Sequence, residues 1–202
     1  TGIGFGALTA NTEGTRNVAV GANSLDANTT ANDNTAIGYD AGSANTTGQM
    51  NTVVGTYAFD ANTTGSFNTA VGRAALSANT DADHNTAIGY QALDVNSTGA
   101  QNTAVGSGAL DANTTADANT AVGYLSLTNN TTGATNTAVG QEALQKNTTA
   151  NNNTATGYQA LEENTTGANN TALGALAGDA VTTGSNNILI GYQAEVSAAT
   201  GE

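Results

Sequence analysis

Asn85-Thr86-Ala87-Ile88-Gly89-Tyr90-Gln91-Ala92-Leu93-Asp94-Val95-Asn96-Ser97-Thr98-Gly99-Ala100-Gln101 is one unit of this chain, and the rest of the sequence is a variation on it. The unit returns with a glycine every 17 residues, from Gly4 to Gly191, without insertion or deletion. A segment of 17 residues is too short to enclose a core of its own. Each unit is therefore expected to be one coil of a stack.

Other positions keep the same register as the glycine. An Asn lies four residues before each glycine from Gly21 onward, and a second Asn lies seven residues after it. Ile or Val precedes the glycine, and Leu usually follows it four residues later. A 34-residue period is also the length of a helical tetratricopeptide unit, but the two Asn-Thr clusters and the glycine in each half leave no room for a useful helix.

The segment Thr-Ala-Ile or Thr-Ala-Val predicts a short strand, because β-branched residues favour extended backbone. Val18 and Ile188 replace the Thr of this segment, which places the Thr and Ile/Val side chains inside and Ala outside. The interior predicted in this way consists of Ile37, Val71, Ile88, Val105, Leu76 and Leu93. The glycine forms a corner. The Ala-Leu-x-x-Asn-Thr-Thr stretch supplies a second strand.

The predicted fold is all-β, a parallel β-solenoid of about twelve 17-residue coils in which residues 1–202 form a single array. Each coil rises by one strand spacing, so twelve coils make a rod of roughly 55–60 Å. Asn side chains in register are expected to form hydrogen-bonded ladders. The competing interpretation is N-linked glycosylation, since Asn28, Asn45, Asn62, Asn96 and Asn113 each begin an Asn-x-Ser/Thr sequon.

One coil offers few large side chains to its interior, which favours burial of a second surface by self-association. The alanines expected to point outward are small enough for close approach of another chain: Ala87, Ala104, Ala121 and Ala138.

Composition excludes several classes of partner. The net charge is −13 with three Lys and Arg residues, so neither nucleic acid nor an anionic membrane is an expected partner. The chain has no Cys, and no apolar run approaches the length of a membrane span. The apolar residues stay in register, which argues against disorder. Both ends fall inside a repeat, so the chain is expected to be a fragment of a longer protein, without caps.

No catalytic, cofactor-binding or metal site is predicted, and the chain is not expected to be an enzyme. His84 is the single histidine and occupies a variable turn position, so no Ser-His-Asp or Cys-His set can be assembled. Asp81 and Asp83 beside His84, and the adjacent Glu162 and Glu163, leave a sugar-cleaving site as a minor alternative. Structural calcium in the Asn/Gly-rich turns is another. The shared Asp position is expected to be a solvated face: Asp26, Asp60, Asp94 and Asp111.

Two rows have further interpretations. Threonines of the Asn-Thr-Thr segments could form an ice-binding ladder, although adjacent threonines point to opposite faces: Thr29, Thr46, Thr63, Thr114 and Thr131. Tyrosines follow alternate glycines at Tyr90, Tyr124, Tyr158 and Tyr192. They are expected to pack at corners, with a subunit interface or a carbohydrate-stacking face as alternatives.

The stretch Gly99-x-x-Asn102-Thr103-Ala104-Val105-Gly106-x-x-Ala109 recurs in nearly every unit. It resembles the head repeats of trimeric autotransporter adhesins, and similar arrays occur in fibre proteins of tailed phages and marine bacteria. The present unit is longer by the Asn-Thr-Thr insert. The resemblance implies a left-handed β-roll in a homotrimer or filament.

The resemblance further implies a non-enzymatic segment of an extracellular, cell-surface or virion fibre. Such a segment projects a tip or presents a repetitive surface to a host glycan or protein. An ice-binding solenoid is the alternative function.

Overall fold

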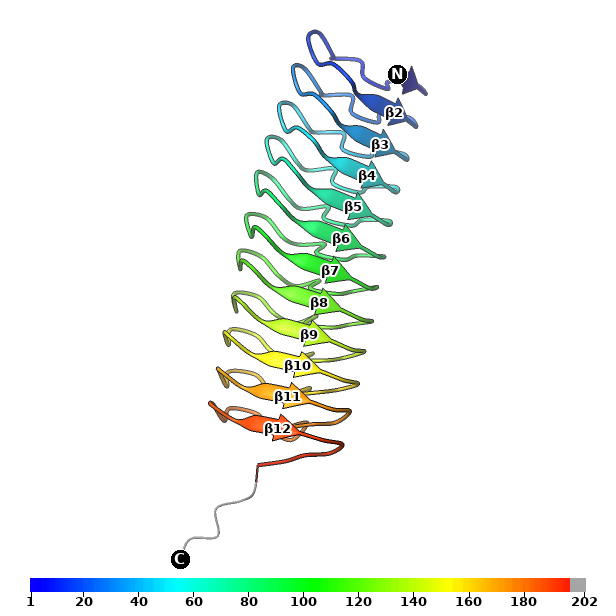
Figure 1. Cartoon of the computed structure of the whole chain (residues 1–202). Coiled ribbons are helices and arrows are strands. Elements are labelled where there is room, and N and C mark those ends of the chain that lie inside the picture. Colours follow the sequence, from blue (N-terminus) through cyan, green and yellow to red (C-terminus); the bar gives the residue numbers. More distant parts are fainter. Residues whose placement is uncertain (197–202) are drawn as a thin grey trace, which may run out of the picture.

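The computed structural model describes residues 1–196 and shows a parallel β-solenoid (Figure 1). Its single sheet contains twelve strands in chain order, each paired in parallel with the next. The strands are β1 (Gly2–Ile3), β2 (Val18–Val20), β3 (Thr35–Ile37), β4 (Thr52–Val54), β5 (Thr69–Val71), β6 (Thr86–Ile88), β7 (Thr103–Val105), β8 (Thr120–Val122), β9 (Thr137–Val139), β10 (Thr154–Thr156), β11 (Thr171–Leu173) and β12 (Ile188–Ile190).

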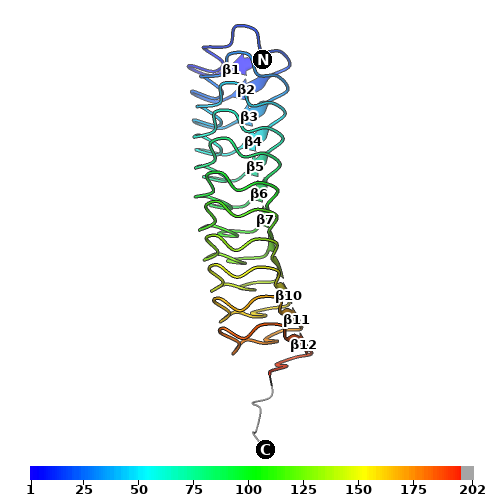
Figure 2. The ribbon, with the colours of Figure 1, turned by 90° about the vertical axis from the view of Figure 1, so that its left-hand side faces the viewer.

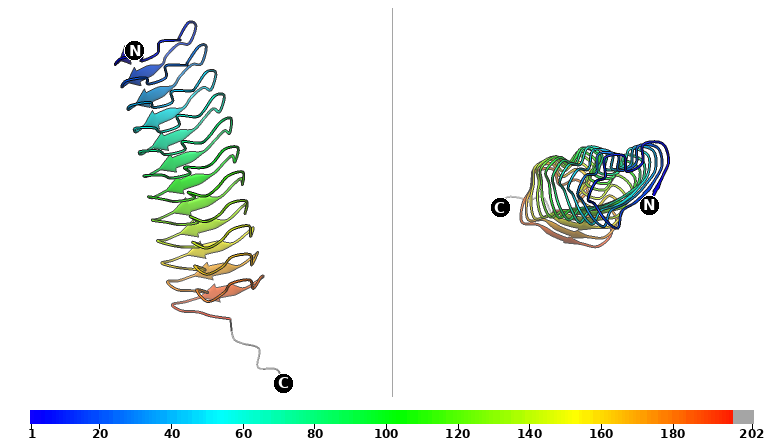
Figure 3. Two further views of the ribbon diagram at one scale, coloured as in Figure 1. Left: turned by 180° about the vertical axis from the view of Figure 1, so that it is seen from behind. Right: turned by 90° about the horizontal axis from the view of Figure 1, so that it is seen from above.

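The pairing register equals the sequence period. Thr86 lies beside Thr103, and Ile88 lies beside Val105, as the constant spacing predicts. Side views show the strands as steps along one side of an elongated shaft (Figure 2). From above, successive coils overlie one another with a small progressive offset (Figure 3). The predicted solenoid of 17-residue coils is therefore confirmed over the described residues.

The predicted second strand is wrong. Residues 1–196 contain one strand per coil, and the Ala-Leu-x-x-Asn-Thr-Thr stretch consists of turns and bends. In the coil after Gly72, Ala74 and Leu76 have φ angles of 55° and 56°, in the left-handed region outside the β range. Backbone hydrogen bonds between coils nevertheless continue there, as in Leu93 N–H to the carbonyl of Ala109 at 3.0 Å.

The predicted face of the strands is also wrong. The central alanine of each strand points inward: Ala87 and Ala104 are fully buried, whereas Ile88 is 40% exposed. Ile37, Val71 and Val105, which were expected inside, likewise lie on the outer face as exposed or half-exposed residues. The apolar replacements that suggested the opposite assignment are outward residues too, since Val18 is 37% and Ile188 is 75% exposed.

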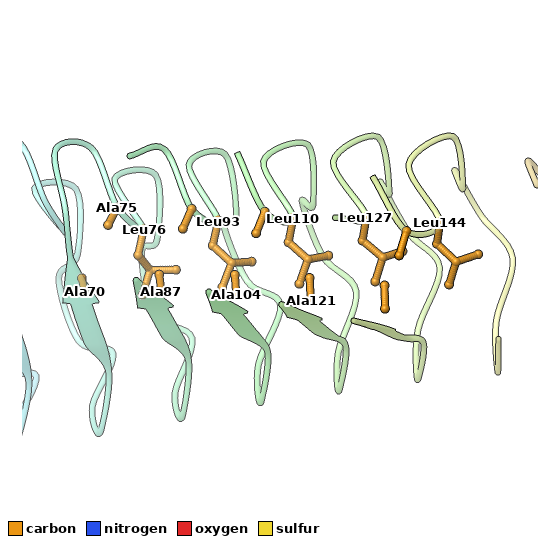
Figure 4. Close-up of a cluster of buried hydrophobic side chains, with 14 of the residues drawn as sticks. Ala70, Ala75, Leu76, Ala87, Leu93, Ala104, Leu110, Ala121, Leu127 and Leu144 are labelled. Carbon is orange, nitrogen blue, oxygen red and sulfur yellow. The ribbon is translucent and has the colours of Figure 1, made fainter. Parts of the chain in front are cut away.

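The core is a column of leucines packed against two columns of alanines. Leu76 and Leu93 are buried as predicted, and the leucines stack coil upon coil opposite the strand alanines (Figure 4). The coil is narrow, so the inner face of the strand has room for a methyl group and not for a pair of β-branched side chains. The alanines predicted to meet another chain, Ala121 and Ala138 among them, are therefore interior residues.

Two ladders of buried asparagines close the other side of the coil. In the column from Asn11 to Asn164, each amide nitrogen donates to the amide oxygen one coil earlier, as Asn113 Nδ2 does to Asn96 Oδ1 at 2.8 Å. The same nitrogen donates to the carbonyl three residues later, here Ala116 at 3.0 Å. This column is the predicted amide ladder. Only Asn164 Oδ1 lacks a partner among the buried side-chain atoms of residues 1–196, because Val181 occupies the next position of the column.

The second Asn column bonds mainly to backbone. Asn85 Oδ1 accepts from the backbone N–H of Asn102 at 2.9 Å, and Asn85 Nδ2 donates to the carbonyl of Gly99 at 2.9 Å. The column therefore fastens the chain just before each strand and fixes the level at which the strand starts.

Candidate functional site

The outer face of the sheet is the most regular exposed surface of the molecule. Each strand from β3 to β11 places its first and third residues outward, so that a threonine row lies beside a row of aliphatic residues. The threonine row contains Thr35, Thr52, Thr69, Thr86, Thr103, Thr120, Thr137, Thr154 and Thr171. The aliphatic row contains Ile37, Val54, Val71, Ile88, Val105, Val122, Val139 and Leu173, with Thr156 as the one polar member. We call the two rows together the strand face.

The strand face carries no charged residue, although the chain has a net charge of −13. Like residues repeat at the spacing of neighbouring strands, about 4.8 Å. Within residues 1–196, the hydroxyls of its nine threonines make no hydrogen bond to the protein, unlike those of the Asn-Thr-Thr segments. The face therefore offers a continuous apolar strip and a parallel line of free hydroxyl groups.

The Asn-Thr-Thr threonines are engaged within the molecule. Thr114 Oγ1 donates to the carbonyl of Thr131 at 3.2 Å, and Thr131 Oγ1 donates to that of Thr148 at 3.0 Å. Thr29, Thr46 and Thr63 make the same contact with the following coil. These hydroxyls have spent their proton on the backbone of the next coil, and their row is a structural ladder.

The sequon asparagines lie inside the coil. Asn28, Asn62, Asn96 and Asn113 are fully buried and Asn45 is 1% exposed. Their amide nitrogens, where a glycan would be attached, donate to the neighbouring Asn and to a backbone carbonyl, as Asn62 Nδ2 does at 2.7 and 3.1 Å. The geometry therefore favours the ladder over glycosylation at these positions.

The acidic residues are dispersed along the shaft. Those of the shared Asp position are half-buried, not fully solvated as expected. Burial raises the pKa of Asp111, and the charge of Asp94 adds to the effect. Burial also raises the pKa of Asp60. Asp94 is hydrogen-bonded by Ser77 and, at 2.9 Å, by Gln91 Nε2.

The carboxylates considered for chemistry serve the structure. Asp83 Oδ1 accepts from the backbone N–H of Ser66 at 2.7 Å, and Glu163 pairs with Lys146. His84 is exposed and stacks on Phe67 with ring centroids 4.9 Å apart. Within residues 1–196 no pocket is found, and no three His, Cys, Asp or Glu side chains gather as a metal site would require.

The tyrosines lie on the surface beyond the corner glycines. Tyr90, Tyr124 and Tyr158 are 46–52% exposed and Tyr192 is 71% exposed. Tyr39 makes an edge-to-face contact with Tyr57, at 5.4 Å between centroids. No helix among the described residues has the length and apolar character of a membrane span.

Searches of protein-family models, of characterised proteins and of solved structures each find no match to this chain. The strand face itself was missed at the sequence stage of reasoning because its two rows were assigned to the interior. The absence of any charged substitution on either row, in so acidic a chain, was the available signal that the rows form one protected or partner-binding surface.

Proposed function

We propose that this chain is a non-enzymatic segment of an extracellular, cell-surface or virion fibre that assembles through the strand face into a homotrimer. The observation that supports the proposal is the uninterrupted aliphatic row, in which Ile37 and Ile88 are each 40% exposed. Contiguous apolar surface of this kind is typical of protein interfaces. Resemblance of the repeat to trimeric adhesin heads and fibre proteins supports the extracellular setting.

The rest of the surface fits this assignment. Acidic residues lie on the turns and keep a long object soluble, while the strand face carries none. Burying the aliphatic row contributes about 25 cal/mol per Å² of apolar area removed from water. Because like side chains repeat at every coil, the gain grows with the number of coils, as a long fibre requires. The function is mechanical: the shaft projects a tip or presents its outer turns.

The test is sedimentation of the parent chain and of two triple variants. Ile88→Lys, Val105→Lys and Val122→Lys place three charges on the strand face. Gln101→Lys, Asn129→Lys and Gln141→Lys add the same charge at exposed positions elsewhere. We expect the parent and the control to sediment as elongated trimers and the face variant as a monomer. A monomeric parent at about 100 μM would contradict the proposal, since an interface of standard size associates well below that concentration.

Ice binding is the second candidate, and the free hydroxyls of the strand threonines favour it. They form a straight row at one strand spacing, about 4.8 Å, on a regular sheet. The relevant threonines are those of the strand face, in place of the engaged Asn-Thr-Thr row.

Thr86→Val, Thr103→Val and Thr120→Val remove hydroxyls and keep the side-chain shape. In an ice-binding protein this triple variant loses thermal hysteresis, whereas Thr114→Val and Thr131→Val, the control, retain it. For a fibre interface we expect no hysteresis in the parent, and a Thr→Val variant that stays trimeric.

A further inference from the structure

The tyrosine row, defined as Tyr90, Tyr124, Tyr158 and Tyr192, has no role in holding the coils together. Ser107, Gln141 and Ala175 occupy the same position in the intervening coils. The corner glycines before Tyr124 and Ser107 have φ angles of 139° and 140°, so the corner has the same shape with either residue. Large aromatic side chains at every second corner therefore need an explanation other than corner packing.

The rings are open to solvent and separated from one another. Two coils correspond to about 9.6 Å along the shaft. Packed aromatic pairs have centroids 4.5–7 Å apart, so neighbouring rings of the row do not cover each other. Tyr90 has the Arg73 guanidinium 5.7 Å from its ring centroid. Tyr124, Tyr158 and Tyr192 have no such aromatic or cationic neighbour within residues 1–196.

Polar groups flank the rings. Gln91 donates to Asp94 at 2.9 Å and Gln159 donates to Glu142 at 2.8 Å, whereas no tyrosine hydroxyl of the row is hydrogen-bonded within residues 1–196. Carboxylate oxygens, amide groups and free phenol hydroxyls thus accompany the apolar ring faces. An apolar protein partner would be served by a continuous stripe, and the polar Ser107 and Gln141 interrupt this one.

We propose that the tyrosine row binds a neutral, extended β-1,4-linked polysaccharide of the cellulose and chitin class. The apolar face of a sugar ring stacks on an aromatic ring, while its hydroxyls bond to polar groups at the edge. The step of about 9.6 Å between tyrosines is close to the disaccharide repeat of such a chain. A ligand lying along the shaft therefore meets an equivalent ring face at every tyrosine.

Charge selects the kind of polysaccharide. The chain carries a net charge of −13, and Asp94 and Glu142 lie beside the row. These carboxylates repel anionic glycans and accept hydrogen bonds from neutral sugars. Each ring contributes little on its own, and the row binds through several simultaneous contacts.

The inference goes beyond the proposed fibre function and does not require it. The tyrosines follow the corner glycine, where the chain has left the strand face. Glycan retention can therefore be measured whether the protein sediments as a trimer or as a monomer.

The experiment is retention on microcrystalline cellulose and on chitin, with soluble cellohexaose, chitohexaose or alginate as competitor. We expect retention on at least one solid, competition by the corresponding neutral hexasaccharide and no competition by the anionic alginate. Tyr124→Ala, Tyr158→Ala and Tyr192→Ala together should lower the bound fraction at least about tenfold. Phe67→Ala, which removes a 50% exposed aromatic from another column, is the matched control and should bind like the parent.

A register variant tests the spacing itself. Ser107→Tyr combined with Tyr124→Ser keeps the number of tyrosines and breaks the two-coil period. It should fold like the parent, because both residues already occupy this position, and bind several-fold more weakly. Absence of retention by the parent on either solid, unchanged binding by the triple variant, or competition by alginate equal to that of the neutral sugars would each overturn the proposal.

Discussion

The corner glycines illustrate how one atom controls the coil. Gly106 has a φ of 140°, and a Cβ built on it would lie 2.3 Å from the carbonyl oxygen of Gly123 in the next coil. Two effects therefore exclude other residues here: a backbone conformation that L-residues avoid, and contact between stacked backbones. The period of the glycines in the sequence records both.

Gly106→Val should disrupt the coils on either side, because the contact is with backbone and cannot be relieved by a side-chain rotation. We expect the free energy of unfolding to fall by at least about 3 kcal/mol, measured by chemical denaturation. Gly191→Ala is the control: its φ is 124°, but a Cβ there meets no atom within 4 Å. It should lose only the conformational part, about 1–2 kcal/mol. Equal losses in the two variants would contradict the close-contact explanation.

At the scale of one coil, the core keeps its volume by paired replacements. Gly42 and Gly178 stand in the leucine column, and eleven residues after each, Val53 and Leu189 stand in the alanine column of the strands. A Cβ on Gly178 would lie 2.5 Å from Leu189 Cδ1, so the Leu189 side chain fills the space that a leucine at 178 would use. Inward-facing strand positions and the leucine column thus share one volume.

Leu189→Ala should therefore leave a cavity and lower the free energy of unfolding by about 2–4 kcal/mol. Gly178→Leu alone should overpack the same place. The double variant restores the pairing found in most coils and should be more stable than the sum of the two single effects, by about 2 kcal/mol in a double-mutant cycle. Additive effects would mean that the two residues do not share a cavity.

Half-buried carboxylates set the pH dependence of the coils. The pKa of Asp111 is raised by burial and by Asp94, so the folded state holds its proton to higher pH than the unfolded state does. The stability contributed by the protonated form is complete below the unfolded pKa and is lost as pH rises through the folded pKa. Asp111→Asn should raise the Tm at pH 7 by about 1–3 °C and change it less at pH 4. Asp81→Asn, at an exposed position, is the control; an equal gain there would indicate a general charge effect.

Prediction from sequence reached different depths for different elements. The Thr-Ala-Val segments were recognised as strands because β-branched residues and a corner glycine bound them. The Ala-Leu-x-x-Asn segment was mistaken for a strand because its leucines adopt a left-handed φ, as Leu110 does at 52°, which propensity does not predict. The strand face was missed because a three-residue strand alternates equally well with either side inward.

At the scale of the whole molecule, length is counted in coils. Deleting residues 103–119 removes one 17-residue unit and joins Asn102 to Thr120 in the same register. The shortened chain should fold and lose one strand spacing of length, about 4.8 Å, measurable by small-angle X-ray scattering. Deleting residues 103–118 removes one residue fewer and misaligns every later glycine and asparagine with those before it. That variant should unfold at the junction; comparable stability of the two deletions would contradict a stack in strict register.

By itself the sequence determined the period, the parallel register, the glycine corners and the asparagine ladders. It could do so because an invariant spacing places each residue above its own counterpart, whatever the shape of the coil. Tertiary structure alone decided which side of the strand is the interior, because that depends on the width left between the strand and the leucine column. A narrow coil accepts alanine there, so the threonine and aliphatic rows lie outside and form the surface on which the proposed assembly rests.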